Sequence, residues 1–564
     1  MKKITLLFLL LPFLGLSQVQ IGEDILGENG QLGFDVSISE NGNIIAVGSP
    51  STVENGDLTG NVKIFENLNG VWTQIGQDIV GEYFSGSGTS IDISSDGTII
   101  AIGSYFDSIS NGNGNGHVRI FENQGGNWAQ IGQDIVGEAY LDQFGRNVSL
   151  SANGNIVAIG APHNLANSQP GYRSGHVRVF ENQGSNWVQI GQDIDGESEQ
   201  DESGSSVSLS ANGNIVAIGA PYNSEINFHF GHVRVYEYQG GNWVQVGLDI
   251  DPEPIGDTSI LQEFGGSVSL NANGNIVAIG ARLGGQLSTS LLLSGNVRVF
   301  ENQGGNWVQL GPDILGDFDN DNFGYSVSLS ANGNILTASA IKNDINLNNS
   351  GQVKVFSYNN SEWVQVGNDI LGEFSGIELG YSLDISSDGN SIILGAPSFN
   401  VNSGLVKVYS ISSELALFEV VEDIFGNVNG ENITAIQLNS IEGVSGAIEG
   451  VNYTTGLQNG TFVDPNNPTP AEIQFIINQV NNALSIEDNE LLNFNLYPNP
   501  TKNQFTIQLN KSSILEKVTI YNTLGQLVLT SENSVVDTSK LASGSYIIEI
   551  TTNNGKASKK LIIE

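Results

Sequence analysis

The sequence contains no cysteine, which excludes disulfide bonds, thiolate catalysis and a lipid anchor on an N-terminal cysteine. Basic residues are also scarce, because 20 Lys and Arg stand against 60 Asp and Glu and give a formal net charge of −40. A protein of this charge repels nucleic acid and anionic membrane surfaces. We therefore expect neither of them as a partner.

Long apolar segments are missing after the first residues of the chain. The run Ile4–Leu16 follows Lys2 and Lys3 and ends before the small residue Ser17, which is the pattern of a secretory signal peptide over residues 1–17. This run is too short to span a bilayer, and no later segment is long enough. The sequence thus predicts an exported protein, secreted or held at the outer cell surface, without a membrane-spanning segment.

The main feature of the sequence is a repeat that occurs seven times. Its period is marked by six tryptophans, 56 to 64 residues apart: Trp72, Trp128, Trp187, Trp243, Trp307 and Trp363. One period contains four short β-like runs, which are Val207–Ser210, Ile215–Ile218, Val233–Tyr236 and Trp243–Ile250. The turn Asn212-Gly213 between the first two is typical of a hairpin. Four antiparallel strands at this period predict one blade of a β-propeller.

The two ends of the repeat region are complementary. Val19–Ile25 reads as a fourth strand without its tryptophan, whereas the last period stops at its third strand, around Val406. The N-terminal strand can therefore complete the last blade, and such closure leaves no exposed sheet edge. We predict an all-β fold in which residues 19–411 form a seven-bladed β-propeller closed by the N-terminal strand.

The repeated motif resembles a known family. Phe144-Gly145, followed by Gly160-Ala161-Pro162, is similar to the FG-GAP repeats that form the blades of integrin-α-like propellers. Many repeats of that family carry a calcium loop of the type Asp-x-Asp-x-Asp-Gly, but most turns here read Ser-Ala-Asn-Gly-Asn and predict plain hairpins.

A separate acidic loop is the candidate Ca²⁺ site, because Asp317, Asp319 and Asp321 place carboxylates at alternate positions. The glycine and glutamate of an EF-hand are replaced there by Asn322 and Ser328.

Charged residues recur with the blades as well. Each third strand carries one basic residue, namely Lys63, Arg119, Arg178, Arg234, Arg298, Lys354 and Lys407. Each fourth strand carries one acid, namely Asp24, Asp78, Asp134, Asp193, Asp249, Asp313 and Asp369. Neighbouring strands bring such residues together, so we expect structural ion pairs. His117, His176 and His232 share one repeated position, and we interpret them as part of the repeat and not as ligands of one shared zinc ion.

Loop variation predicts the binding face. The connections after the second and fourth strands vary in length and content, and variable loops on a rigid scaffold are where recognition usually occurs. The candidate ligand-binding residues in these loops are aromatic, namely Tyr105, Tyr172, Tyr222, Phe228 and Phe230. Their rings could stack on sugars or fill a protein pocket. The sequence therefore favours a binding or adhesion protein whose ligand is a protein or a glycan.

Catalytic motifs are missing: the sequence has no Gly-x-Ser-x-Gly elbow, no HExxH helix and no phosphate-binding loop. We therefore expect no enzymatic activity. Two alternatives stay open, a carbohydrate-active or other hydrolytic enzyme and a purely structural component of the cell surface or matrix.

The repeat ends near residue 411. Residues 423–487 predict a small helical module or spacer, in which Thr469-Pro470-Ala471-Glu472 forms a capping box. Residues 491–564 predict a small β-sandwich. The opening Tyr497-Pro498-Asn499-Pro500 and the segment Gly544-Ser545-Tyr546 resemble the C-terminal sorting domain of type IX secretion in Bacteroidetes. That resemblance implies export through the type IX secretion machinery, with release or attachment at the cell surface.

Overall fold

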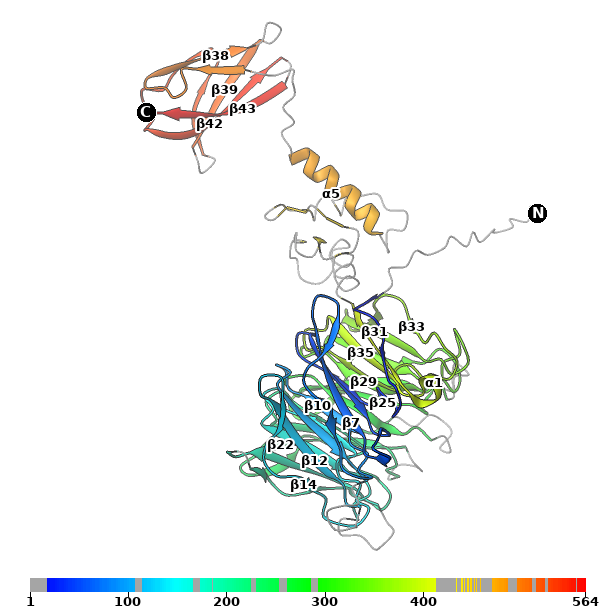
Figure 1. The fold of residues 1–564 in the computed structure, drawn as a ribbon. Helices are drawn as coiled ribbons and strands as arrows, with labels where there is room; N and C mark the ends of the chain where they lie inside the picture. Colours follow the sequence, from blue (N-terminus) through cyan, green and yellow to red (C-terminus); the bar gives the residue numbers. More distant parts are fainter. Residues whose placement is uncertain are drawn as a thin grey trace, which may run out of the picture. The chain divides into compact units, whose positions relative to one another are not determined.

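The structure is a computed structural model of the 564-residue chain. It describes residues 18–106, 114–165, 173–184, 186–224, 230–252, 261–285, 293–411, 469–484, 494–509, 514–522, 526–553 and 555–564, together with single residues and pairs between 433 and 457. The chain divides into two units, Met1–Glu431 with Ser440–Glu442 and Asn432–Asn439 with Gly443–Glu564. Small antiparallel sheets are present in both units (Figure 1).

Seven sheets follow one another in the first unit, and we number them along the chain. The first is β3 (Val36–Ile38), β4 (Ile44–Ser49), β7 (Asn61–Asn67), β8 (Trp72–Gln74) and β9 (Ile79–Val80). The second is β10 (Ser90–Ile93), β11 (Ile99–Ser104), β12 (His117–Asn123), β13 (Trp128–Gln130) and β14 (Ile135–Val136). The third is β15 (Asn147–Leu150), β16 (Ile156–Ala161), β17 (His176–Asn182), β18 (Trp187–Gln189) and β19 (Ile194–Asp195). The fourth is β20 (Ser206–Leu209), β21 (Ile215–Ala220), β22 (His232–Gln239) and β23 (Asn242–Gln245).

The remaining three sheets repeat this order. The fifth is β24 (Phe264–Leu270), β25 (Ile276–Ala281), β26 (Asn296–Asn302), β27 (Trp307–Gln309) and β28 (Ile314–Leu315). The sixth is β29 (Phe323–Leu329), β30 (Ile335–Ala340), β31 (Gln352–Asn359), β32 (Glu362–Gln365) and β33 (Ile370–Leu371). The seventh combines β34 (Ser382–Ile385), β35 (Ser391–Ala396) and β36 (Leu405–Ser410) with β1 (Val19–Gln20) and β2 (Ile25–Leu26). The hairpin β5 (Val53–Glu54)–β6 (Asp57–Leu58) and the short α1 (Phe399–Asn402) are insertions in loops.

The predicted pairing between the ends of the repeat region is present. Val19 pairs with Ser410, and Ile25 pairs with Val406, both in antiparallel register. The N-terminal strands thus cover the outer edge of β36, which would otherwise carry unpaired backbone groups.

The tryptophans of the first six sheets connect each of these sheets to a neighbouring sheet. The Trp187 indole Nε1 donates to the Ile131 carbonyl oxygen at 2.9 Å, and Trp243 donates to Ile190 at 2.9 Å. Trp72 donates to Ile21 at 2.8 Å, so the first sheet is joined to the N-terminal segment in the same way. The rings also enter the apolar layers between sheets. This explains why the sequence repeats a tryptophan and not merely any large apolar residue.

The innermost strands are joined in a closed circuit of contacts, in which β3, β10, β15, β20, β24, β29 and β34 touch in turn and β34 touches β3. A polar side chain in the middle of each strand makes the connection. The Ser149 hydroxyl accepts a hydrogen bond from the Leu209 amide of the next sheet at 3.0 Å, and Asp92 accepts one from the Leu150 amide at 2.6 Å. Between β34 and β3, Asp384 accepts from the Ile38 amide at 3.0 Å.

Two of the seven circuit positions hold aspartate, and five hold serine. Burial raises the pKa of Asp92 to about 7, and repulsion from Asp384 adds to the rise. Burial likewise raises the pKa of Asp384 to about 6. Asp35, which lies just before β3, has its pKa raised by burial to about 8.

The second unit is described by itself. Its helix α5 (Pro470–Leu484) begins with the predicted capping box, since the Thr469 amide donates to the Glu472 carboxylate at 2.8 Å. Two sheets follow, β37 (Phe494–Tyr497)–β38 (Gln504–Leu509)–β41 (Val535–Asp537) and β40 (Leu527–Ser531)–β39 (Leu515–Tyr521)–β42 (Gly544–Thr552)–β43 (Gly555–Ile563). Both contribute to one apolar core. Among the described helices, none has the length and hydrophobicity needed to cross a membrane.

The buried aspartates predict a pH-dependent stability. The folded protein holds a proton on Asp92 more tightly than the unfolded chain does, because the unfolded pKa is about 3.9. The contribution of Asp92 to stability is therefore greatest at low pH and falls as the pH rises from about 4 through 7. Asp92→Ser should remove this loss, since serine supports the same hydrogen bond in other sheets. We expect the variant to be more stable by on the order of 2 kcal/mol at pH 8, with no gain at pH 4, in urea unfolding. The same dependence of the free energy of unfolding on pH in the parent and in the variant would contradict this prediction.

Candidate functional site

A polar pocket of about 420 Å³ lies in the first unit, where inner strands begin and second strands end. Its wall includes Tyr105, Phe106, Gln143, Arg146, His163, Glu202, Ser205, Tyr222, Glu263, Gly266, Arg282 and Tyr325. Gly266 and Tyr325 lie in β24 and β29, and the other residues lie in loops of the second to the fifth sheet, so neighbouring repeats build the pocket together. A volume of this size suits a small ligand or a few units of a polymer.

The pocket is made from positions that vary inside an otherwise regular phrase. The residue after the repeated glycine near the start of each inner strand varies between sheets, and reads Phe34, Thr89, Arg146, Ser205, Gly266, Tyr325 and Tyr381. The second residue after Gly-Ala, Gly-Ser or, in the sixth repeat, Ser-Ala is similarly variable, and reads Ser51, Phe106, His163, Tyr222, Leu283, Lys342 and Ser398. Repeated residues build the scaffold, whereas these changing positions give one side of it a particular chemistry.

A third wall position has a constrained backbone. Gln143, Glu202 and Glu263 have φ angles of 56°, 52° and 52°, in the left-handed region that non-glycine residues seldom occupy. The carbonyl of each accepts a hydrogen bond from the amide three residues later, as in Glu202 with Ser205 at 3.1 Å. The tight turn fixes the direction in which each long polar side chain leaves the backbone.

Two arginines supply positive charge to the pocket. Arg282 forms an ion pair with Glu263 and lies over the Tyr325 ring at 5.6 Å. Arg146 lies over the Tyr105 ring at 5.1 Å. Within the described residues, no carboxylate is within ion-pairing distance of Arg146. Its guanidinium can therefore receive an anionic group from a ligand.

His163 and Glu202 lie side by side on the pocket wall, with His163 Nε2 at 3.6 Å from Glu202 Oε1. Burial lowers the pKa of His163 to about 4, and the positive charges of Arg173 and Arg146 add to this effect. Burial raises the pKa of Glu202, although Arg173 partly offsets the rise. At neutral pH His163 is consequently uncharged, and its Nε2 accepts a hydrogen bond from the Arg173 guanidinium at 3.1 Å.

Only some of the candidate aromatic residues line the pocket. Tyr105 and Tyr222 line the pocket, and burial raises the pKa of each phenol. Phe230 is only 1% exposed and packs in the protein interior, so it offers no surface to a ligand. Tyr172 and Phe228 lie outside the described residues. The arginines, glutamates and Tyr325 were not among the residues selected from the sequence, although their variation within the repeat was a usable signal.

The acidic loop does not gather its three carboxylates around one point. Asp317 receives the Lys354 ammonium at 2.7 Å, and Asp321 is buried and accepts a hydrogen bond from Asn343 at 2.7 Å. Asp319 is exposed. Among the described residues, these aspartates are absent from the groups whose oxygens converge within metal-binding range. Local partners thus account for two of the three proposed Ca²⁺ ligands.

The predicted ion pairs between third and fourth strands are confirmed in several sheets. Arg119 contacts Asp134 at 2.8 Å, Arg298 contacts Asp313 at 2.8 Å, and Lys407 contacts Asp24 at 3.0 Å. Lys407 also contacts Glu373 at 3.1 Å, in the loop that leaves the sixth sheet. The charges therefore join strands within a sheet and sheets to one another.

Comparison with known proteins identifies the end of the chain. Residues 495–564 match the family described as the secretion system C-terminal sorting domain. This confirms the predicted type IX sorting domain and implies interaction with the type IX secretion machinery. The protein is accordingly exported, and is either anchored at the outer cell surface or released.

One relative is similar over a short part of its length. The ulvan lyase NLR42 of Nonlabens ulvanivorans is 41% identical over 87 residues, which cover 14% of this chain and 16% of that protein. The chain thus matches about a sixth of the relative's length. An alignment this short leaves open whether the chain is an enzyme.

The electrostatics of the pocket predict how His163 titrates. Its pKa of about 4 means that the imidazole stays neutral at pH 5.5, where an ordinary histidine is mostly charged. We expect its ring signals in an NMR titration to shift only below pH 5. His163→Ala serves to assign the signals, and a midpoint near 6.5 would contradict the buried environment described here.

Proposed function

We propose that residues 19–411 form a seven-bladed β-propeller of the FG-GAP type and that its pocket binds an anionic glycan. Seven consecutive antiparallel sheets, the circuit of contacts between inner strands, and the pairing of β1 and β2 with β36 support the propeller. Residues 423–487 would act as a spacer between this propeller and the sorting domain of residues 491–564.

The observation that carries the glycan proposal is the placement of Arg146 and Arg282 in one pocket with Tyr105, Tyr222 and Tyr325. Guanidinium groups bind carboxylates and sulfates through paired hydrogen bonds, and tyrosine rings pack against the faces of sugars. A chain with a net charge of −40 repels polyanions elsewhere on its surface. Attraction of an anionic ligand therefore depends on these arginines.

The shape of the site favours a glycan over a protein ligand. A concave pocket of about 420 Å³ accommodates sugar units, whereas a stable protein interface covers roughly 800 Å² on each partner. A purely structural component of the surface or matrix would not need arginines and tyrosines gathered at the variable positions. Adhesion of the cell to an acidic polysaccharide is the biological role that follows.

A carbohydrate-active enzyme is the second candidate. His163 is neutral at physiological pH and lies 3.6 Å from Glu202, whose pKa is raised by burial, so an imidazole and a carboxyl group of the kind used in acid–base catalysis share one pocket. The short similarity to a protein named as an ulvan lyase agrees with a polysaccharide substrate.

Binding can be measured by calorimetry with three polymers: a polyuronate, a sulfated polysaccharide and a neutral glucan. We expect the acidic polymers to bind and the neutral one not to bind. The double variant Arg146→Ala with Arg282→Ala should weaken binding at least tenfold, or about 1.4 kcal/mol, and added salt should weaken it in the parent protein.

The matched control removes two positive charges far along the sequence, in Lys517→Ala with Lys540→Ala, both of which are exposed. This control should bind as the parent does. Equal binding of the neutral glucan, or an unchanged affinity of the arginine variant, would refute the proposed ligand class.

Enzymatic activity has a separate readout, the appearance of new chain ends in a polysaccharide that binds. The second candidate predicts such ends, and His163→Ala should lower their rate at least a hundredfold while binding is retained. If bound polysaccharides stay intact over long incubation, binding alone is the function of the pocket.

A further inference from the structure

We propose that two clusters, each built around a buried histidine between neighbouring sheets, bind a divalent transition metal ion such as Zn²⁺. The first consists of Glu138, His176 and Asp193, and the second of Glu197, His232 and Asp249. In each cluster one ligand atom from every residue lies within 4.8 Å of the others. The two clusters have the same composition and the same place in successive repeats.

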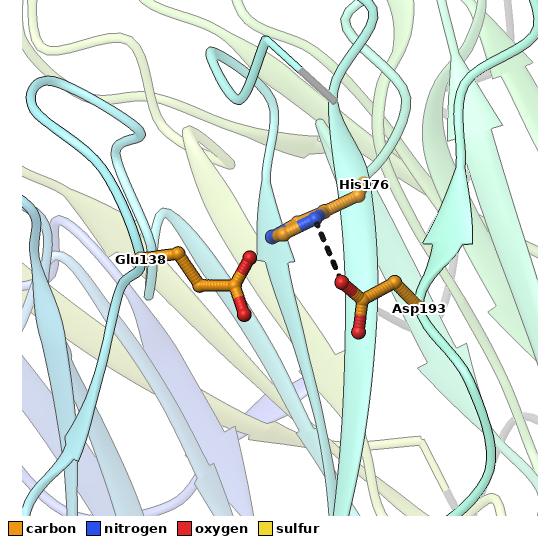
Figure 2. Close-up of side chains that lie close together, drawn as sticks. All are labelled: Glu138, His176 and Asp193. Atoms are coloured by element: carbon orange, nitrogen blue, oxygen red, sulfur yellow. Dashed lines mark ion pairs between the residues drawn. The ribbon is translucent and has the colours of Figure 1, made fainter. Parts of the chain in front are cut away.

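The repeat positions the three side chains of the first cluster (Figure 2). His176 is the first residue of β17, and Asp193 directly precedes β19 in the same sheet. Glu138 follows β14, which belongs to the preceding sheet. The imidazole lies between the two carboxylates, with Nδ1 at 3.9 Å from Asp193 Oδ2 and the other ring nitrogen directed toward Glu138. An ion at this point would connect the second sheet to the third.

Burial leaves the imidazoles without the hydrogen bonds that they need. The His176 side chain is 1% exposed, and its Nε2 has no hydrogen-bond partner among the described residues. The His232 side chain is fully buried, and neither of its ring nitrogens has such a partner. A buried polar atom without a partner costs about 1–3 kcal/mol, so native proteins rarely keep one without a reason. Coordination of a metal ion by the ring nitrogen would satisfy it.

The donor set is that of a zinc site. One imidazole nitrogen and two carboxylate oxygens leave a fourth position for water, as in sites with three protein ligands. A purely oxygen-liganded Ca²⁺ site would not use a buried imidazole.

One arginine lies near each cluster, and it does not form close ion pairs with both carboxylates. Arg178 lies 3.6 Å from Glu138 and 3.8 Å from Asp193, and its Nε donates instead to Gln189 at 3.0 Å. In the second cluster, Arg234 contacts Glu197 at 3.2 Å, whereas Asp249 lies 3.5 Å from His232 Nδ1. The two carboxylates outweigh the single guanidinium in each cluster, so a cation is electrostatically favoured.

The second sheet provides a matched control within the chain. His117, Glu82 and Asp134 stand at the equivalent positions, but Arg119 donates to both Glu82 and Asp134. These carboxylates are therefore neutralised by a close guanidinium, and the trio is absent from the groups that converge on one point within the described residues. We expect no metal there.

Metal content tests this proposal on the full chain, freed of metal with a chelator and then titrated with Zn²⁺ in buffer containing excess Mg²⁺ to occupy exposed carboxylates. We expect two tightly bound ions per chain by calorimetry and elemental analysis. His176→Ala should retain one ion, and the double variant His176→Ala with His232→Ala should retain none. His117→Ala should still bind two.

A second readout keeps the test valid if a histidine variant folds poorly. Zn²⁺ should raise the Tm of the parent protein, since an ion that binds only the folded state stabilises it. The loop variant Glu138→Gln with Glu197→Gln should lose this rise while circular dichroism shows an unchanged fold. Absence of tight Zn²⁺ binding by the parent, or two ions retained by either double variant, would overturn the proposal.

Discussion

The pairing of β1 and β2 with β36 is the constraint on which the first unit depends. Each sheet buries its faces against the sheets on either side, so a row of such sheets has an unsatisfied face and an open edge at each end. Here the N-terminal strands supply the edge of the seventh sheet, and Ile21 accepts the hydrogen bond from Trp72 of the first. Asp384 and Ile38 join the innermost strands at the same junction.

Regularity and variation have separate roles in this scaffold. Tryptophans, inner serines and paired charges recur because every junction between sheets has the same geometry to satisfy. The pocket uses the positions that change, such as Arg146 and Tyr325, which are equivalent in the repeat but different in chemistry. The two clusters around buried histidines are neither present in every repeat nor confined to one. Two successive repeats have such a cluster, whereas Arg119 neutralises the equivalent carboxylates in a third. Glu138 and Gln143 share one loop, as do Glu197 and Glu202, so the clusters and the pocket depend on the same loops.

Much of the fold could be predicted from the sequence, because strands, hairpin turns and the period are local patterns. The pairing of Val19 with Ser410 was also predictable, since the missing fourth strand of the last repeat had one counterpart at the other end. The pocket was harder, because its wall depends on which loops converge. Tyr105 and Tyr222 were found by their aromatic character, but the same criterion selected Phe230, whose ring is buried because a loop can also bury apolar groups. The sequence also indicated Asp317 as a calcium ligand, because its ion pair with Lys354 joins residues 37 positions apart and is not a local pattern.

Closure can be measured directly because the chain has no cysteine to interfere. Val19→Cys combined with Ser410→Cys places two thiols at positions paired across β1 and β36. Under mild oxidation, we expect an intramolecular disulfide in the monomer, seen as the loss of both free thiols and a change in gel mobility that reductant reverses, while each single variant keeps its thiol. Two thiols that remain free in the folded double variant would contradict the closed arrangement.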